Sequence, residues 1–196
     1  MPICAIRFMF ISNKRRETHE IWIPINVFLL LLVIISGIYF WNVFVRSEVV
    51  HGKNWIAKRY GTTYVVSVKN RVELVSALND FATVNNVKLG NVFGIGAVNE
   101  ATLRFFNPET KKYDDKKFSG QMEITNLSGN ISEMDGSLYT HFHITLGNSN
   151  YEALAGHLLN ARLNGAGEFV VYTQPKGHIE RTKNENVGLN FYDFEK

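Results

Sequence analysis

The sequence predicts an α+β fold: a mainly antiparallel β-sheet with one long packed helix and a shorter helix, preceded by an N-terminal hydrophobic helix. Three observations lead to this prediction. Most segments after residue 60 are short and rich in β-branched and aromatic residues, which favours strands. One segment, residues 70–85, has clear helical periodicity. The 196 residues are 45% hydrophobic and 20% charged, as in a globular rather than a disordered protein.

A long apolar segment comes before this domain. Residues 21–45 carry no charged side chain and include the apolar run Val27–Ile35. Because about 20 apolar residues cross a bilayer, this segment predicts a transmembrane or signal-anchor helix. Trp22, Tyr39 and Trp41 lie near its ends, where aromatic side chains favour the membrane interface. The alternatives are a buried helix of a soluble protein and a cleaved signal.

The apolar segment divides the chain into four predicted parts. These are a basic N-terminal segment at 1–20, the hydrophobic helix at 21–45, a linker at 46–59 and a globular domain at 60–196. Positive charges flank both ends of the helix and leave its orientation undetermined. Single N-terminal anchors most often export the domain that comes after them. We therefore expect a membrane-anchored protein with an extracytoplasmic domain, and a cytoplasmic domain is the alternative.

The globular part begins with a predicted strand at Thr62–Lys69, which is β-branched and aromatic. Asn70 is the expected N-cap of the long helix, with Glu73 in the capping-box position. Apolar residues then recur at helical spacing, and the helix is expected to end near Asn85. The apolar positions are Leu74, Val75, Leu78, Phe81 and Ala82.

The rest of the domain is predicted mainly as strands. They are expected at residues 88–106 (two strands, with glycines breaking the first), 118–127, 138–146, 162–173 and 187–194. Residues 150–159 predict the shorter helix or a structured loop. Gly94-Ile-Gly96 lacks the third glycine of a dinucleotide-binding fingerprint and precedes a strand-like sequence, so no nucleotide cofactor is expected. Its glycines indicate a bulge or a close backbone approach.

Three histidines are the strongest functional signal. His141 and His143 are two residues apart in a predicted strand, so both side chains leave it on one face, and His157 follows in the next segment. Three imidazoles are a known zinc ligand set, so these residues predict a divalent metal site with zinc as the expected ion. The alternative is a set of hydrogen-bonded structural residues. Rings more than ~8 Å apart could not share an ion whose bonds span about 2.1 Å.

The charge balance and the cysteine content reduce the number of functional classes that fit this domain. From Lys53 onward there are 16 Lys+Arg and 15 Asp+Glu, a net charge of 16 − 15 = +1. A nucleic-acid binder normally carries a basic face, so this balance argues against strong binding by the domain alone. The single cysteine, Cys4, cannot form an internal disulfide, and the chain has no Cys-x-x-Cys motif. The nucleophile elbow Gly-x-Ser-x-Gly does not occur either.

Several motifs occur in order between Tyr60 and Tyr172, and together they resemble the plants-and-prokaryotes conserved (PPC) domain of prokaryotic type. The motifs are Gly94-Ile-Gly96-Ala97, Gly120-Gln-Met-Glu123, Asp135-Gly136, His141-Phe-His143 and Ala155-Gly156-His157-Leu158. The resemblance implies an α+β domain that assembles as a homotrimer. It also implies a histidine cluster at His141, His143 and His157, and it brings Glu123 close to them.

The resemblance implies a trimeric metal-binding interaction module in a family that is commonly labelled DNA-binding. This chain lacks the Arg-Gly-Arg-Pro sequence of the plant AT-hook, so DNA is an alternative partner only. A further alternative is a zinc-dependent enzyme in which Glu123 serves as acid or base toward zinc-bound water. Six aromatic residues are candidates for a trimer interface or for ordinary core packing. They are Phe105, Phe106, Tyr113, Phe191, Tyr192 and Phe194.

Overall fold

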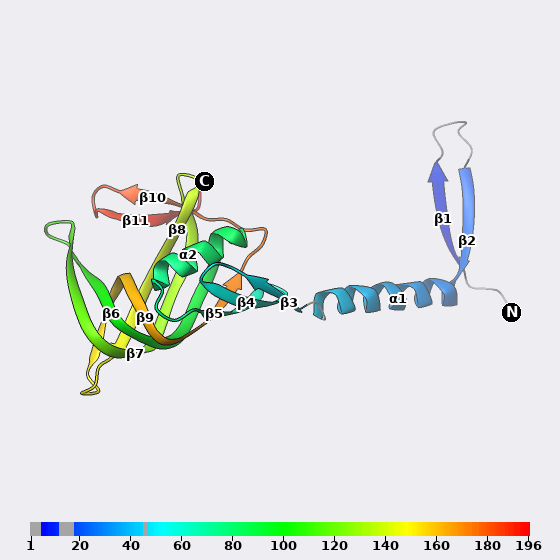
Figure 1. The fold of residues 1–196 in the computed structure, drawn as a ribbon. Helices are drawn as coiled ribbons and strands as arrows, with labels where there is room; N and C mark the ends of the chain where they lie inside the picture. The colour runs from blue at the N-terminus through cyan, green and yellow to red at the C-terminus, as the bar shows by residue number, and fades with distance from the viewer. Residues whose placement is uncertain (1–4, 12–17, 45–46) are drawn as a thin grey trace. The chain divides into compact units, whose positions relative to one another are not determined.

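The structure is a computed structural model that describes residues 5–11, 18–44 and 47–196 (Figure 1). The chain divides into two compact units, Met1–Arg46 and Ser47–Lys196, which are described separately. In the first unit, β1 (Ala5–Ile11) pairs with the antiparallel strand β2 (Thr18–Pro24), and α1 (Ile25–Phe44) follows directly.

The first unit corrects the expected membrane anchor. Residues 21–24 of the predicted helix belong instead to β2, where Ile21 pairs with Phe8 and Pro24 pairs with Ala5. The helix therefore starts only at Ile25. Among the residues that the structure describes, no helix combines the length and the apolar character needed to cross a bilayer. The predicted membrane-anchored location, with a membrane contact through residues 21–45, is wrong on this finding.

The second unit is built on a nine-stranded sheet and one helix, which confirms the α+β class with a mainly antiparallel sheet. In chain order its elements are β3 (Ser47–His51), β4 (Trp55–Tyr60), β5 (Thr63–Val68), α2 (Leu74–Val84), β6 (Gly90–Asn107), β7 (Lys112–Met134), β8 (Ser137–Gly147), β9 (Ala153–Thr173), β10 (Glu180–Asn184) and β11 (Leu189–Asp193). The sheet order is β11-β10-β7-β6-β9-β5-β4-β3. All its strand pairs are antiparallel except β10 with β7.

Strand β8 closes part of this sheet on itself. It pairs with β7 along one edge and with β9 along the other, while β6 also pairs with both β7 and β9. The four strands therefore form a closed ring of pairings around a shared apolar interior. Leu127, Phe142, Leu146 and Leu163 are at most 2% exposed within it. Side chains at alternate positions of β8 point away from this interior.

Helix α2 packs its apolar face on the core, as its periodicity predicts. Leu74, Leu78 and Phe81 are nearly fully buried. The N-cap differs from the expected one, because it is Glu73 rather than Asn70. The Glu73 carboxylate accepts hydrogen bonds from the amides of the first turn, and the Asn70 side chain accepts one from Gly165 N at 3.1 Å instead. The expected helix start was therefore about one helical turn too early.

The shorter helix predicted at residues 150–159 is not formed, because the chain makes a turn there and enters β9. Asn148 Oδ1 accepts hydrogen bonds from the backbone amides of Asn150 and Glu152, at 2.9 and 3.0 Å. This Asx-type turn reverses the chain, so that β9 runs back along β8. His157 consequently lies on a strand.

The glycine-rich segment of β6 forms bulges within one strand. The register of β6 against β7 shifts between Gly94 and Gly96, and the strand continues to Asn107. A side chain at Gly94 would place its Cβ 2.6 Å from the carbonyl oxygen of Glu168, so the neighbouring strand approaches too closely for any other residue. The bulges bend β6 and allow the closed ring to form.

Candidate metal centre

All three predicted histidines converge on the outer side of the β8–β9 pair. His141 and His143 flank Phe142 on β8, and the buried Phe142 side chain points into the core. His157 on β9 is the direct cross-strand partner of His143. Directly opposed residues have Cβ atoms about 4.5–5.5 Å apart, so the two backbones fix the positions of these imidazoles.

The imidazole nitrogens lie close enough together to reach a shared ion with a small movement of a ring. Nε2 of His143 and Nε2 of His141 are 3.2 Å apart, and the three residues offer one nitrogen each within 4.8 Å of one another. Two nitrogens bound at ~2.05 Å to a tetrahedral ion would be about 3.3 Å apart. The ring centroids are separated by 4.9, 5.1 and 5.4 Å. The rings therefore lie well inside the ~8 Å limit beyond which they could not share an ion.

The surroundings of His157 and His141 favour the neutral form of the ring, which is the form that binds metals. Burial and the neighbouring His141, His143 and Arg104 together lower the pKa of His157 to about 4, against a smaller opposing effect of Asp115. Burial, followed by the positive charges of His143 and Arg181, also lowers the pKa of His141. At neutral pH both rings are uncharged, so a metal ion has no proton to displace from them.

A cavity of about 660 Å³ lies against the histidines, and we call it the histidine cavity. Its walls come from three places in the chain: the β6–β7 hairpin, the β8–β9 pair and β11. The lining residues are Arg104, Phe105, Phe106, Tyr113, Tyr139, His141, His143, Ala155, Gly156, His157, Leu189, Asn190 and Phe191. The sequence did not indicate this cavity, because its walls are brought together by pairing between distant segments.

Two arginines stand near the histidines. Arg104 makes a two-point ion pair with Asp115, at 2.8 and 3.2 Å, and lies over the ring of Tyr113. The Tyr113 ring lies in turn 5.4 Å from that of His157. Arg181 is only 6% exposed and lies 4.9 Å from the ring centroid of Tyr139. No local sequence pattern marks either arginine as part of the site.

The structure does not bring Glu123 to the histidines. Glu123 is not in the group of converging ligand atoms, and it lines a different pocket with Gln121 and Asn164. In the β7–β8 register it faces Gly147, whereas His143 faces Ser128, five residues farther along β7. At ~3.3 Å per residue this is a separation of about 16 Å. Within one chain, Glu123 is too far away to act as acid or base on a bound water.

Comparison with known families identifies the domain. The family model of the Plants and Prokaryotes Conserved (PCC) domain, also abbreviated PPC, matches residues 56–174. The chain belongs to the PCC family. This confirms the resemblance that the sequence motifs indicated. No curated protein matches the chain significantly.

Solved structures share the PCC fold. The chain is 54% identical to a proposed DNA-binding protein from Bacteroides thetaiotaomicron, with a TM-score of 0.72, covering 74% of this chain and 100% of that one. It is 26% identical to a PPC protein from Pyrococcus horikoshii, with a TM-score of 0.63 and coverage of 75% and 99%. It is 27% identical to a metal-containing protein from Archaeoglobus fulgidus, with a TM-score of 0.61 and coverage of 75% and 97%.

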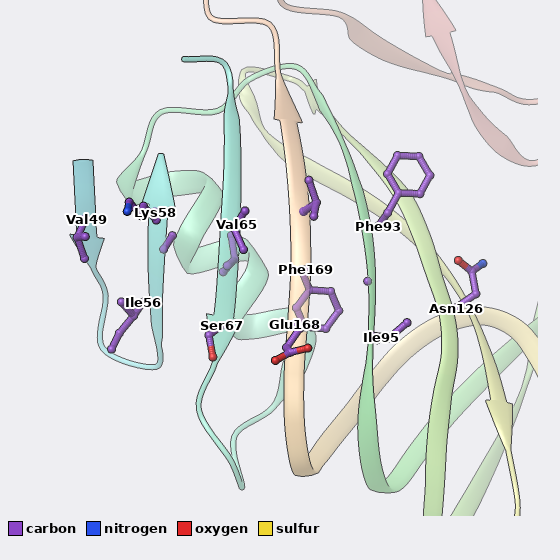
Figure 2. A pocket seen from close by; sticks show the side chains of 14 residues that line it. Val49, Ile56, Lys58, Val65, Ser67, Phe93, Ile95, Asn126, Glu168 and Phe169 are labelled. Atoms are coloured by element: carbon purple, nitrogen blue, oxygen red, sulfur yellow. The ribbon is translucent and has the colours of Figure 1, made fainter. Parts of the chain in front are cut away.

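The second unit also has an exposed apolar patch on its sheet, away from the histidine cavity. Five large side chains on β3, β4, β5 and β6 form this outer apolar face, and each is about half exposed (Figure 2). They are Val49, Ile56, Val65, Phe93 and Ile95. On β4 and β5 their immediate neighbours along the chain are buried, so these two strands have apolar residues on both faces. Strands of this kind are typical of sheets that are covered on both sides.

Proposed function

We propose that this chain is a trimeric PCC-domain module that holds one divalent metal ion, zinc, per subunit through His141, His143 and His157. The convergence of three imidazole nitrogens within 4.8 Å carries the proposal. The relative from Archaeoglobus fulgidus that is called metal-containing supports it. Three histidines leave the fourth tetrahedral position of zinc for a water or an external ligand.

Metal analysis of the full-length protein tests the metal site. Protein purified without chelators is expected to contain about one zinc per chain by elemental analysis, following the one-ion geometry of the site. The double variant His141→Ala/His157→Ala is expected to contain none. His178→Ala is the matched control, because His178 is exposed and is not among the converging ligands. Zinc that is absent from the wild type, or retained in the double variant, would refute the site.

The outer apolar face supports the trimeric assembly. Monomeric proteins rarely expose contiguous apolar patches larger than a few hundred Å². Here Ile56, Val65 and Ile95 are 44–55% exposed and belong to β4, β5 and β6 of the same sheet, in which β9 lies between β5 and β6. A closed ring of three subunits would cover such a face without leaving a free copy of it. Of the six aromatic residues considered for an interface, Phe105, Phe106, Tyr113 and Phe191 line the histidine cavity instead.

Binding to duplex DNA is the second candidate, favoured by the proposed DNA-binding role of the 54% identical relative. Fluorescence anisotropy with a labelled random duplex tests it. A binder is expected to give a dissociation constant that rises with salt, because bound Lys and Arg displace counterions from phosphates. Lys111, Lys112, Lys116 and Lys117 in and beside the β6–β7 turn are the substitutions to make first. No change in anisotropy at low ionic strength would eliminate DNA.

A further inference from the structure

The histidine cavity is larger than a purely structural metal site requires. Its volume of about 660 Å³ falls within the ~300–1,000 Å³ of small-molecule sites. Two of its wall residues present large apolar surfaces, since Phe105 is 74% exposed and Phe191 is 48% exposed. Together with Phe106 and Leu189, they give the cavity an apolar wall next to the imidazoles.

The charge around the cavity is positive. Among the described residues that line it, none is an aspartate or a glutamate. Asp115 neutralises Arg104, but Arg181 behind the histidines has no such partner in the part of the chain that the structure describes. Its guanidinium donates to Ser132 Oγ, Asn190 O and Asn130 Oδ1, all neutral acceptors.

This buried cation is held by neutral groups, and its positive charge is not neutralised by them. The rings of Tyr139 and Tyr192 lie 4.9 and 4.2 Å from the Arg181 guanidinium carbon, and aromatic faces attract a cation without cancelling its charge. A divalent ion on three neutral imidazoles adds two further positive charges close by. Because buried charge is costly without a counter-charge, a metal-loaded site of this kind favours an anion at the fourth position of the metal.

We propose that the histidine cavity binds a small organic carboxylate with an apolar body. The carboxylate occupies the open position of the metal, and the apolar body lies against Phe106 and Phe191. Carboxylate oxygens bind zinc at about 2.0–2.2 Å, so this group suits both the metal and the positive charge. An inorganic anion would satisfy the charge but would leave the aromatic wall in water. This inference rests on the proposed metal site.

Phenylacetate and 2-phenylethanol are suitable probes, because both carry a phenyl group and only phenylacetate carries a carboxylate. The full-length protein is loaded with Co²⁺, whose visible spectrum reports its ligands, and each probe is titrated in. Phenylacetate is expected to change the spectrum until the site is saturated. It is expected to bind at least about tenfold more tightly than either 2-phenylethanol or acetate. Calorimetry on zinc-loaded protein is expected to give one site per chain, and metal-free protein is expected to bind at least about tenfold more weakly.

The Phe191→Ala substitution tests the apolar wall. It is expected to weaken phenylacetate binding by about fivefold or more while metal content stays unchanged. Phe194→Ala is the matched control, because Phe194 is 77% exposed and does not line the cavity. Protein that takes up no Co²⁺ or Zn²⁺ would overturn the metal site and this proposal together. Metal uptake without a spectral change on phenylacetate addition, or acetate binding as tightly as phenylacetate, would overturn the carboxylate proposal alone.

Discussion

His143 on β8 and His157 on β9 are direct cross-strand partners in an antiparallel pair. Their imidazole centroids are 5.4 Å apart, and His141 lies two residues along β8 on the same face. Two paired backbones, rather than a loop, therefore set the spacing of the nitrogens. A site held in this way loses little conformational freedom when the ion binds, which favours tight coordination.

This preorganisation predicts that zinc stabilises the folded chain. A metal that binds only the native state, at 100 times its dissociation constant, raises the free energy of unfolding by about 2.7 kcal/mol. We therefore expect the midpoint temperature of thermal unfolding, measured by calorimetry on the full-length protein, to rise when zinc is added after chelation. His143→Ala should remove that rise, and His178→Ala should leave it. An equal rise in both variants would place the stabilising zinc elsewhere.

The lowered pKa of His157 predicts a pH dependence for the metal-free protein. Its value of about 4 lies below the 6.5 of an ordinary histidine. Between these values the unfolded chain binds more protons, so the stabilisation from neutral His157 is complete above about pH 6.5 and is lost as pH falls toward 4. Because the ring is only half-buried, solvent screening reduces the effect to on the order of 1 kcal/mol.

Urea unfolding of chelated protein at about pH 7.5 and about pH 4.5 measures this effect. Other groups also titrate in this range, so the informative quantity is the difference from His157→Gln. The wild type should lose more stability on acidification than the variant, whose residue 157 cannot be protonated. Equal losses in the two proteins would show that His157 makes no contribution.

The N-cap of α2 predicts a second stability change. Glu73 accepts hydrogen bonds from Val75 N at 3.0 Å, Ser76 N at 2.6 Å and Ala161 N at 3.2 Å. Glu73→Ala removes all three hydrogen bonds, so we expect a loss of about 1–2 kcal/mol in the free energy of unfolding, measured with urea. Glu109→Ala, on the exposed β6–β7 turn, should change stability by less than about 0.5 kcal/mol. Equal losses of stability in the two variants would contradict the role of Glu73 as N-cap.

The same cap illustrates how far the sequence could predict this fold. The apolar spacing from Leu74 to Ala82 predicted the buried face of α2, because that pattern depends only on helical geometry. The choice of Glu73 over Asn70 as N-cap depends on β9. The backbone amide of Ala161 donates a hydrogen bond to the Glu73 side chain, and that of Gly165 donates one to the Asn70 side chain. Contacts with a strand about ninety residues away leave no local signal.

The candidate site, like the helix cap, could be predicted from the sequence only in part. The spacing of His141 and His143 alone predicted that both rings share a face, because strand side chains alternate. The position of His157 required the turn at Asn148 and the β8–β9 register, and residues 150–159 were expected to be helical or looped instead. Arg181 joins the site through a C-terminal strand that pairs with β11 and β7. Such long-range pairing cannot be derived from one sequence.

The outer apolar face predicts how the assembly can be broken. A stable interface buries roughly 800 Å² per partner, mostly apolar at its centre, so a charge placed there is costly. We expect the wild type to sediment at three times the 22.4 kDa of the chain, and Ile95→Glu to shift it toward one. Val84→Glu is the matched control, because Val84 is 59% exposed on α2 and is not part of the outer apolar face.

Sedimentation velocity on the full-length proteins distinguishes the outcomes, with circular dichroism to verify that each variant is folded. A folded Ile95→Glu variant that remains trimeric would show that the trimer uses another surface. A monomeric wild type would refute the trimeric part of the proposed function. Neither result would affect the histidines, since the outer apolar face and the histidine cavity share no lining residue. Metal content measured on the same samples therefore tests the two halves of the proposed function independently.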